Sequence, residues 1–184
     1  MKDGILELIR GIEAFDELER NHKDDAIKWI ESGVEIFRIA KPDIPPKHLV
    51  SYFVLIDEVQ GKIFLVDHIK AGLWLPAGGH VEPNENPKTT VEREAEEELK
   101  IKTNFINEKP FFITQAVTVN IAAGHTDVSL WYVLKGAADA PIDYDPREFN
   151  GCKWFTYDEL LDTPISKLDP NLHRFMHKWI RAHG

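Results

Sequence analysis

Three glutamates in a short stretch of the chain have the spacing of a metal site. Glu94, Glu97 and Glu98 stand at i, i+3 and i+4, so in a helix they share one face and repel one another. A hard divalent cation would remove this conflict, because such ions bind oxygen ligands and carboxylates in particular. The alternative, a solvated acidic face, suits Glu92 and Glu96, which point elsewhere around the helix.

The helix that must position these acids has a clear start and an apolar stripe. Asn86 is predicted as its N-cap and Pro87 as its first residue. Val91, Ala95 and Leu99 recur at helical spacing beside the acidic stripe. We therefore expect the helix to pack on a sheet through these aliphatic residues, with the three glutamates at the border between core and water.

A pair of glycines, Gly78 and Gly79, stands ahead of this helix and permits a sharp turn with a close approach of substrate or metal to the backbone. The spacing that follows is Gly79, five residues, Glu85, seven residues, and then Arg93-Glu94-Ala95-x-Glu97-Glu98-x-x-Ile101. This pattern resembles the signature of the Nudix hydrolase family, and in particular its MutT-like nucleotide pyrophosphohydrolases.

Two positions depart from the family pattern. Ala95 stands where a larger aliphatic residue is usual, and Lys100 stands where the family places glycine. The helix must then end without a left-handed residue, or Lys100 must adopt that conformation at a cost of about 1 kcal/mol.

The resemblance implies a role for each residue of the motif. Glu94, Glu97 and Glu98 would be catalytic and would bind the metal, helped by the Gly78 carbonyl, and one of them or a more distant acid would be the general base. Gly79, Glu85 and Arg93 would be structural, the last two as an ion pair that braces the loop against the helix. The family often adds an acid from a late loop, for which Glu148 is the first choice and Asp145 and Asp143 are alternatives.

The activity that the resemblance implies is hydrolysis of a nucleoside diphosphate linked to another group. Mg²⁺ or Mn²⁺ would neutralise the diphosphate, and water would attack one phosphorus. His80 and Glu82 flank the glycine turn, and His125 and Asp127 lie in or beside a connection between two strands, so we expect all four to contact the substrate.

The substrate itself is chosen by elimination. The segment 114–120 lacks the Pro or Tyr that marks some subfamilies, and the arrays associated with coenzyme A and with NADH pyrophosphatases are also absent. These absences disfavour ADP-ribose, dinucleoside polyphosphates, coenzyme A and NADH without excluding them, and they make a nucleoside triphosphate, ordinary or modified, the default substrate. Two other classes stay open, namely an idle Nudix-like domain that binds a nucleotide as a sensor, and an isomerase on the same scaffold. The isomerase requires a cysteine near the metal, and Cys152 lies far along the chain.

Composition limits the partners and the compartment. The formal charge of −9 disfavours an extended nucleic-acid surface, although bound cations would still allow a small phosphorylated substrate. No apolar run has the length of a membrane span, and the N-terminus lacks the apolar segment of a signal peptide. A single cysteine fits a reducing compartment, so we expect a cytoplasmic protein without a membrane partner.

The order of the elements predicts an α/β fold with a mixed sheet between helices, for which the resemblance supplies the α-β-α Nudix sandwich over roughly 48–161. We expect a helical N-terminal extension over 1–40 and a Nudix domain over 47–184, with the proline-rich 41–46 between them. The expected strands are 49–56, 62–68, 73–76, 111–120, 127–134 and 151–156, and the expected terminal helices are 158–161 and 170–182.

The N-terminal extension is predicted to form two helices within 1–39, separated near 16–24. Trp29, Ile30, Val34 and Phe37 would give the second helix an apolar stripe that must be buried. The stripe packs either on the chain's own sheet or against its counterpart in a second copy. A Nudix core has flanking helices of its own, so the second arrangement, a homodimer, is the one we expect.

Overall fold

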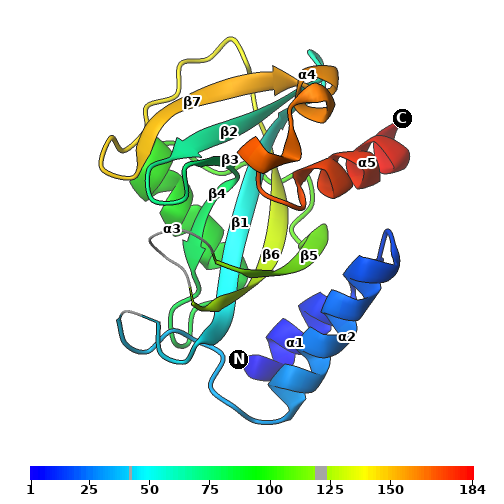
Figure 1. The fold of residues 1–184 in the computed structure, drawn as a ribbon, viewed down its shortest axis with the longest axis vertical. Helices are drawn as coiled ribbons and strands as arrows, with labels where there is room; N and C mark the ends of the chain where they lie inside the picture. The colour runs from blue at the N-terminus through cyan, green and yellow to red at the C-terminus, as the bar shows by residue number, and fades with distance from the viewer. Residues whose placement is uncertain (42, 119–123) are drawn as a thin grey trace.

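A computed structural model describes residues 1–41, 43–118 and 124–184 and shows a seven-stranded mixed sheet between two layers of helices (Figure 1). The helices are α1 (Lys2–Arg10), α2 (Glu17–Glu31), α3 (Pro87–Leu99), α4 (Tyr157–Asp162) and α5 (Leu172–His183), with a short 3-10 helix at Ile165–Lys167. The strands are β1 (Lys47–Asp57), β2 (Lys62–His68), β3 (Leu73–Leu75), β4 (Ala77–His80), β5 (Phe112–Val117), β6 (Thr126–Lys135) and β7 (Phe149–Thr156). The predicted fold class, a mixed sheet sandwiched by helices, is confirmed.

Strand β1 is the centre of the sheet. The main strand order is β3-β2-β1-β6-β5, and β7 pairs with β2. β1 runs parallel to β6 along nearly its whole length, whereas β2 and β4 pair with it antiparallel, β4 over the segment that includes Val50 and Phe53. The first half of β1 therefore lies between β4 and β6, which brings residues far apart in the sequence side by side.

The core has two halves, one on each face of the sheet. Leu49 and Phe53 of β1 pack with buried residues of α1, α2 and α3, whereas Val54 and Ile56 pack with those of α4 and α5. This separation follows from the two-residue period of a strand, which turns successive side chains to opposite faces. A sheet buried on both faces explains why the predicted strands are continuous apolar runs.

Helix α3 forms as its sequence predicts. Asn86 is extended and its side chain accepts a hydrogen bond from the Lys88 amide at 2.9 Å, which caps the first turn. Its apolar stripe, represented by Val91 and Ala95, is fully buried. The helix ends at Leu99, and the capping residue that follows, Lys100, has φ 55° and ψ 31°. Of the two helix ends considered, the structure thus has the left-handed lysine, in place of the glycine that this conformation favours.

The second N-terminal helix differs from its prediction at both ends. It begins at Glu17, inside the segment expected to separate the helices, because the Asp16 side chain accepts the Glu19 amide at 2.8 Å and caps it. Its first turns are polar, so they carry no apolar repeat that would have indicated a helix. It ends at Glu31, before Gly33 with φ 80°, so the predicted continuation to Phe37 is wrong.

The predicted apolar stripe is buried within the chain itself. Ile30 and Phe37 lie in the same half of the core as Leu49 of β1, whereas Val34 is 44% exposed. Figure 1 shows α1 and α2 beside β5 and close to α5. Of the two arrangements considered, the structure has the stripe packed on its own sheet, so the reason for expecting a homodimer is removed.

One strand, β4, was not predicted, because its glycine pair indicated a turn. The other elements agree with the predictions apart from small shifts. β7 begins at Phe149 rather than at 151, and α5 begins at Leu172 rather than at 170. Residues 119 and 120 of the fifth predicted strand, residues 121–123 of the following connection, and Pro42 lie outside the described residues. In the part of the chain that is described, no helix is long and apolar enough to cross a membrane.

Candidate active site

The glycine strand and the acidic helix are fitted to each other. Gly78 has φ 144°, and a Cβ on it would collide with the Ser51 carbonyl oxygen of β1. A Cβ on Gly79 would collide with the carboxylate of Glu94. Gly78 is therefore required for β4 to pair with β1, whereas a side chain at Gly79 would displace the Glu94 carboxylate from its place across the strand.

The glutamates of α3 differ in their surroundings. Glu98 is partly buried and its Oε2 accepts the Gly78 amide at 3.1 Å. Burial and then the nearby Glu94 carboxylate raise the pKa of Glu98 to about 8. Burial also raises the pKa of Glu94, against the opposing effect of Arg93. The Glu97 side chain is 61% exposed and lies at the rim.

Arg93 ties the loop before α3 to the helix. Its Nε and Nη2 donate to the two carboxylate oxygens of Glu85 at 3.0 and 3.1 Å, its Nη2 donates to the His80 carbonyl at 3.2 Å, and its Nη1 donates to Glu94 at 2.7 Å. Thr90 donates to Glu85 as well. Burial alone would raise the pKa of Glu85, but these bonds outweigh it and hold that pKa below its usual value.

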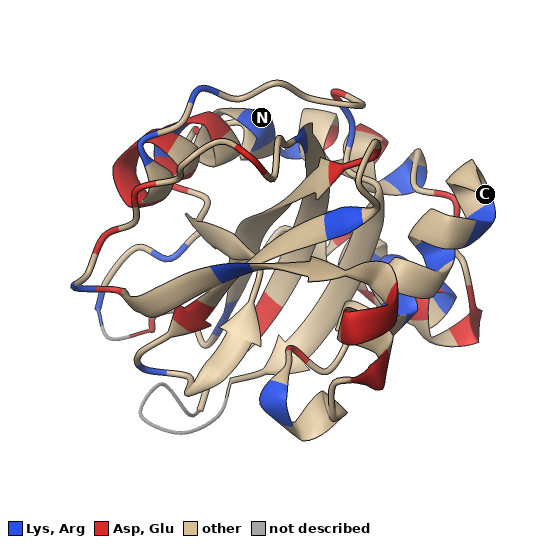
Figure 2. Ribbon diagram, turned by 90° about the horizontal axis from the view of Figure 1, so that it is seen from above, with Lys and Arg blue, Asp and Glu red and all other residues tan. Residues whose placement is uncertain are grey.

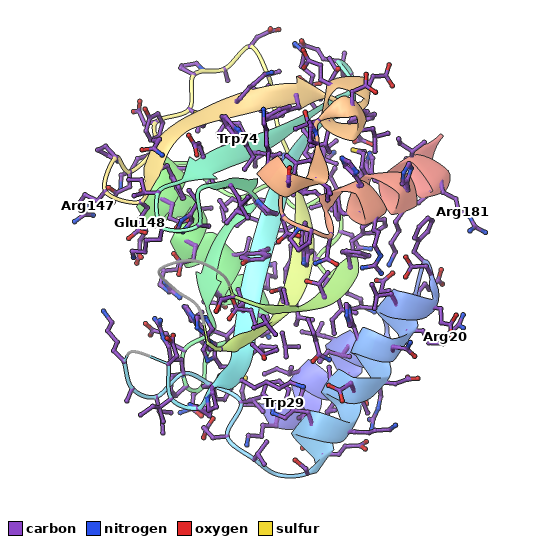
Figure 3. The ribbon with its side chains drawn as sticks, in the orientation of Figure 1. Arg20, Trp29, Trp74, Arg147, Glu148 and Arg181 are labelled. Carbon is purple, nitrogen blue, oxygen red and sulfur yellow. The ribbon has the colours of Figure 1, made fainter. Side chains whose placement is uncertain are left out.

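A cavity of about 910 Å³ opens beside these acids. Glu94 and Glu98 line it from the helix, and Glu148 lines it from the loop before β7. A smaller hollow of about 300 Å³ is lined by Glu94, Glu97, Glu98, Lys100, Asp145, Arg147 and Glu148. Figure 3 shows Glu148 on the side of the molecule where α3 lies.

Of the three late acids considered, Glu148 lies best for this site. The Asp145 carboxylate forms an ion pair with Arg147, whose Nη2 lies 2.5 Å from it. Asp143 lines neither cavity. Glu148 lines both, is close enough to raise the pKa of Glu98, and forms a loose ion pair with Lys70 at 3.6 Å.

The four residues expected to contact the substrate, His80, Glu82, His125 and Asp127, all line the larger cavity. His48 and Asp43, which were not predicted, lie against His80 and His125. His48 could have been found from the pairing of β1 with β6, which places it opposite Asp127, whereas Asp43 lies before β1 and has no such signal. A single sequence does not reveal that pairing.

The acidic group has the donor chemistry for a divalent cation. Glu98 has a raised pKa, and none of the ion pairs among the described residues involves it. Two carboxylates close to each other at the edge of the core are stabilised by a cation, and oxygen ligands are those that Mg²⁺ and Mn²⁺ prefer. The residues present therefore fit such an ion.

Three solved structures with a similar fold are described as hydrolases. A MutT Nudix hydrolase from Burkholderia pseudomallei has 22% identity and a TM-score of 0.54, covering 71% of this chain and 95% of that one. A Nudix-family hydrolase from Clostridium perfringens has 21% identity and a TM-score of 0.57, with 74% and 98% covered. The dihydroneopterin triphosphate pyrophosphohydrolase of E. coli has 13% identity and a TM-score of 0.54, with 77% and 98% covered.

The family model described as the NUDIX domain matches residues 47–179. No protein with curated annotation matches the chain. This match, together with the fold, defines the class of the protein as a hydrolase domain, in which an acidic helix is set against a glycine strand. The chain belongs to the Nudix family and is a Nudix hydrolase, with a function of the nucleotide pyrophosphohydrolase kind. Enzymes of this family generally use divalent metals and act on small nucleotide-like substrates.

Proposed function

We propose that the protein is a cytoplasmic, Mg²⁺-dependent hydrolase that cleaves the diphosphate linkage of a nucleotide by attack of water on phosphorus. The observation that carries the proposal is the pair Glu94 and Glu98, held together across the glycine strand at the wall of a large cavity. Burial and mutual repulsion leave these two acids in need of a cation.

Glu94, Glu97 and Glu98 would hold Mg²⁺ or Mn²⁺ together with the Gly78 carbonyl, and Glu148 would complete the set. The ion would neutralise the diphosphate and acidify a water molecule. One of the acids accepts the proton of the attacking water. Gly79 leaves room for the Glu94 carboxylate.

Around the metal, His80, Glu82, His125 and Asp127 would contact the substrate from the cavity wall. Arg93 and Glu85 fix the end of β4, which carries His80, and the following loop, which carries Glu82. These residues orient the substrate rather than react with it, so their loss would raise KM more than it lowers kcat.

The substrate that we propose is a nucleoside triphosphate, ordinary or modified. A triphosphate is also named as the substrate of one protein of similar fold. Figure 2 shows Lys and Arg interspersed with Asp and Glu over the described chain rather than gathered on one element. That distribution and the net charge of −9 favour a small substrate over a long nucleic acid.

The test is release of phosphate or pyrophosphate from a panel of nucleotides with Mg²⁺, for the wild type, Glu98→Gln and Glu96→Gln. Glu96 lies on the same helix but is exposed and points away from the site, so its variant is the matched control. We expect release by the wild type and the control, and its loss in Glu98→Gln. Nucleotide binding without any release would contradict the proposal and favour the idle sensor domain.

A further inference from the structure

A second group of side chains that could bind a metal lies at the end of β4. Within the described residues, Asp43, His48, His80 and His125 each offer a ligand atom, and these four atoms lie within 4.8 Å of one another. The group contains three imidazoles, so its chemistry differs from that of the all-carboxylate group on α3. It shares with that group the cavity of about 910 Å³, whose wall includes Asp43, His80 and His125.

The pairing of three strands builds this group. His48 of β1 lies opposite Asp127 of β6, and Val50, two residues after His48, lies opposite His80 of β4. Residues two apart on a strand share a face, so His48, His80 and Asp127 point to the same side of the sheet. The rings of His48 and His80 are 4.7 Å apart between centroids, and those of His48 and His125 are 4.8 Å apart.

One hydrogen bond fixes which nitrogen of His48 faces the group. Its Nδ1 lies 2.9 Å from the Pro45 carbonyl oxygen, which can only accept, so the proton is on Nδ1. The Nε2 atom then presents a lone pair to the group. Holding a ligating histidine by a carbonyl on its other nitrogen is the usual support for a metal-bound imidazole.

Several ligand atoms in the group lack a hydrogen-bond partner among the described residues. His48 has 0% exposure, and its Nε2 is unpartnered, as are Nε2 of His80 and Oδ1 of Asp127. Asp127 Oδ1 lies 3.2 Å from Nε2 of His48 and 3.3 Å from Nε2 of His125, without the alignment of a hydrogen bond to either. Buried acceptors that face one another require a cation or an added proton between them.

We propose that Asp43, His48, His80 and His125 bind a divalent transition-metal ion of the Zn²⁺ type, with Asp127 beside it, as a second metal site separate from the glutamates of α3. His80 and His125 would then act on the substrate through this ion rather than by direct contact. Imidazole nitrogens with one carboxylate suit Zn²⁺ and its neighbours, whereas Mg²⁺ prefers oxygen ligands alone.

The competing explanation is a proton in place of the metal. Burial lowers the pKa of His48, but the Asp127 carboxylate and the Pro45 carbonyl outweigh it and raise that pKa overall. A protonated His48 facing Asp127 would satisfy both side chains as an ion pair without any ion. The two explanations predict different metal binding in a large excess of Mg²⁺, which would occupy the glutamates of α3 but not the imidazoles. If the group is a metal site, a transition-metal ion still binds to it under these conditions, whereas a protonated His48 leaves no such site.

The experiment uses the full chain, stripped of metal by a chelator, and Co²⁺ as a spectroscopic probe for Zn²⁺ in the presence of excess Mg²⁺. We expect one Co²⁺ per chain, with visible absorption bands that indicate nitrogen ligands. His48→Gln and His125→Gln should each weaken binding by more than about 100-fold, beyond the loss that an outer partner causes. His68→Gln is the matched control, because His68 lines the same cavity outside the group.

Three results would overturn the proposal. They are the absence of Co²⁺ binding under excess Mg²⁺, unchanged binding in both histidine variants, and loss of binding in Glu98→Gln, which would place the ion at α3. If the histidine variants do not fold, nitrogen NMR of the wild-type imidazoles with Zn²⁺ decides instead. A doubly protonated His48 contradicts the metal, and a metal-shifted Nε2 supports it. None of these measurements depends on hydrolysis, so this proposal and the proposed function fail separately.

Discussion

At the scale of single residues, burial decides what each glutamate of α3 can do. Glu94 and Glu98 lie across β4 where water is largely excluded, so their charges cost free energy until a cation compensates them. Glu96 is exposed on the same helix and carries no such cost. Whether a glutamate of this helix belongs to a metal site therefore depends on how deeply its carboxylate is buried as well as on its residue type.

The first prediction concerns Glu98. Its pKa of about 8 is raised above the ordinary 4.5, so in the metal-free protein its carboxylate destabilises the fold increasingly as pH rises between these values, and fully above pH 8. Glu98→Gln should therefore melt at a higher temperature than the wild type in chelator, with a larger difference at pH 9 than at pH 6. The variant should lose activity by at least about 100-fold.

Glu96→Gln is the control for this prediction, and its melting difference should stay constant over the same pH range. Thermal melts in chelator and turnover at saturating Mg²⁺ are the two measurements. Near wild-type turnover of Glu98→Gln would remove Glu98 from the proposed metal site, whatever the melts show.

Arg93 carries the second prediction. Arg93→Ala leaves the half-buried Glu85 carboxylate without its bidentate partner and the His80 carbonyl without a donor. We expect the free energy of unfolding to fall by about 1–3 kcal/mol, with activity falling as well. Denaturant unfolding measures the first and phosphate release the second. A loss of activity at unchanged stability would make Arg93 a substrate contact instead of a brace.

At the scale of elements, ion pairs join the two ends of the chain. Lys178 of α5 donates to Glu19 of α2 at 2.8 Å and to the Phe111 carbonyl at 2.6 Å. Arg174, one turn earlier on α5, binds both carboxylate oxygens of Asp16, the N-cap of α2. The N-terminal helices are thereby held at α5 as well as on the sheet.

The third prediction tests the buried pair. Lys178→Met keeps most of the length of the side chain but leaves Glu19, which has 0% exposure, without a counter-ion. Breaking a buried pair in this way costs about 3–5 kcal/mol. The double variant Glu19→Gln, Lys178→Met removes both charges and should recover part of that loss. Equal stability of the single and double variants in denaturant unfolding would contradict this prediction, because it would show that the Glu19 carboxylate does not need Lys178 as its counter-ion.

The fourth prediction follows from the pH dependence of Asp16. The hydrogen bonds from Arg174 lower the pKa of Asp16 from 3.8 to about 2. A lowered pKa means that the pair stabilises the fold above pH 4 and that this contribution is lost as pH falls toward 2. Asp16→Asn keeps an equally good N-cap, so it removes the ion pair alone. Its melting temperature should lie below the wild type at pH 6 and approach it near pH 2. A difference independent of pH would contradict the assignment.

The sequence predicted elements best where local signals agree. Asn86-Pro87 and the apolar stripe defined α3, and the hairpin of β1 and β2 followed from two apolar runs around Gly61. The start of α2 was missed because its first turns are polar and carry no apolar period. Helical spacing correctly placed Glu97 on the same face as Glu94 and Glu98, but it did not predict that the Glu97 side chain is 61% exposed. Only half of the histidine group was predicted from the sequence. His48 joins it through the register of β1 and β6, whereas Asp43 joins it from the segment before β1, and both placements depend on contacts between distant segments.

At the scale of the whole molecule, the N-terminal helices complete one face of the core. Ile5, Ile9 and Ile30 are almost fully buried together with residues of β1 and β6. Those side chains leave no large apolar stripe on α2 to pair with a second copy. The division into 1–40 and 47–184 stays a prediction about which parts fold independently.

The last prediction decides that division and the oligomeric state together. We expect the full chain to be a monomer by light scattering, because its N-terminal apolar residues are already buried. A chain that begins at Lys47 should be less stable and should aggregate. It loses the buried partner of Lys178 and exposes apolar side chains, each worth roughly 1.5–3 kcal/mol when buried. Thermal melting and light scattering of both chains are the measurements. A stable monomer from Lys47 onward would establish the helices as an independent extension, and a dimeric full chain would require an interface away from α2.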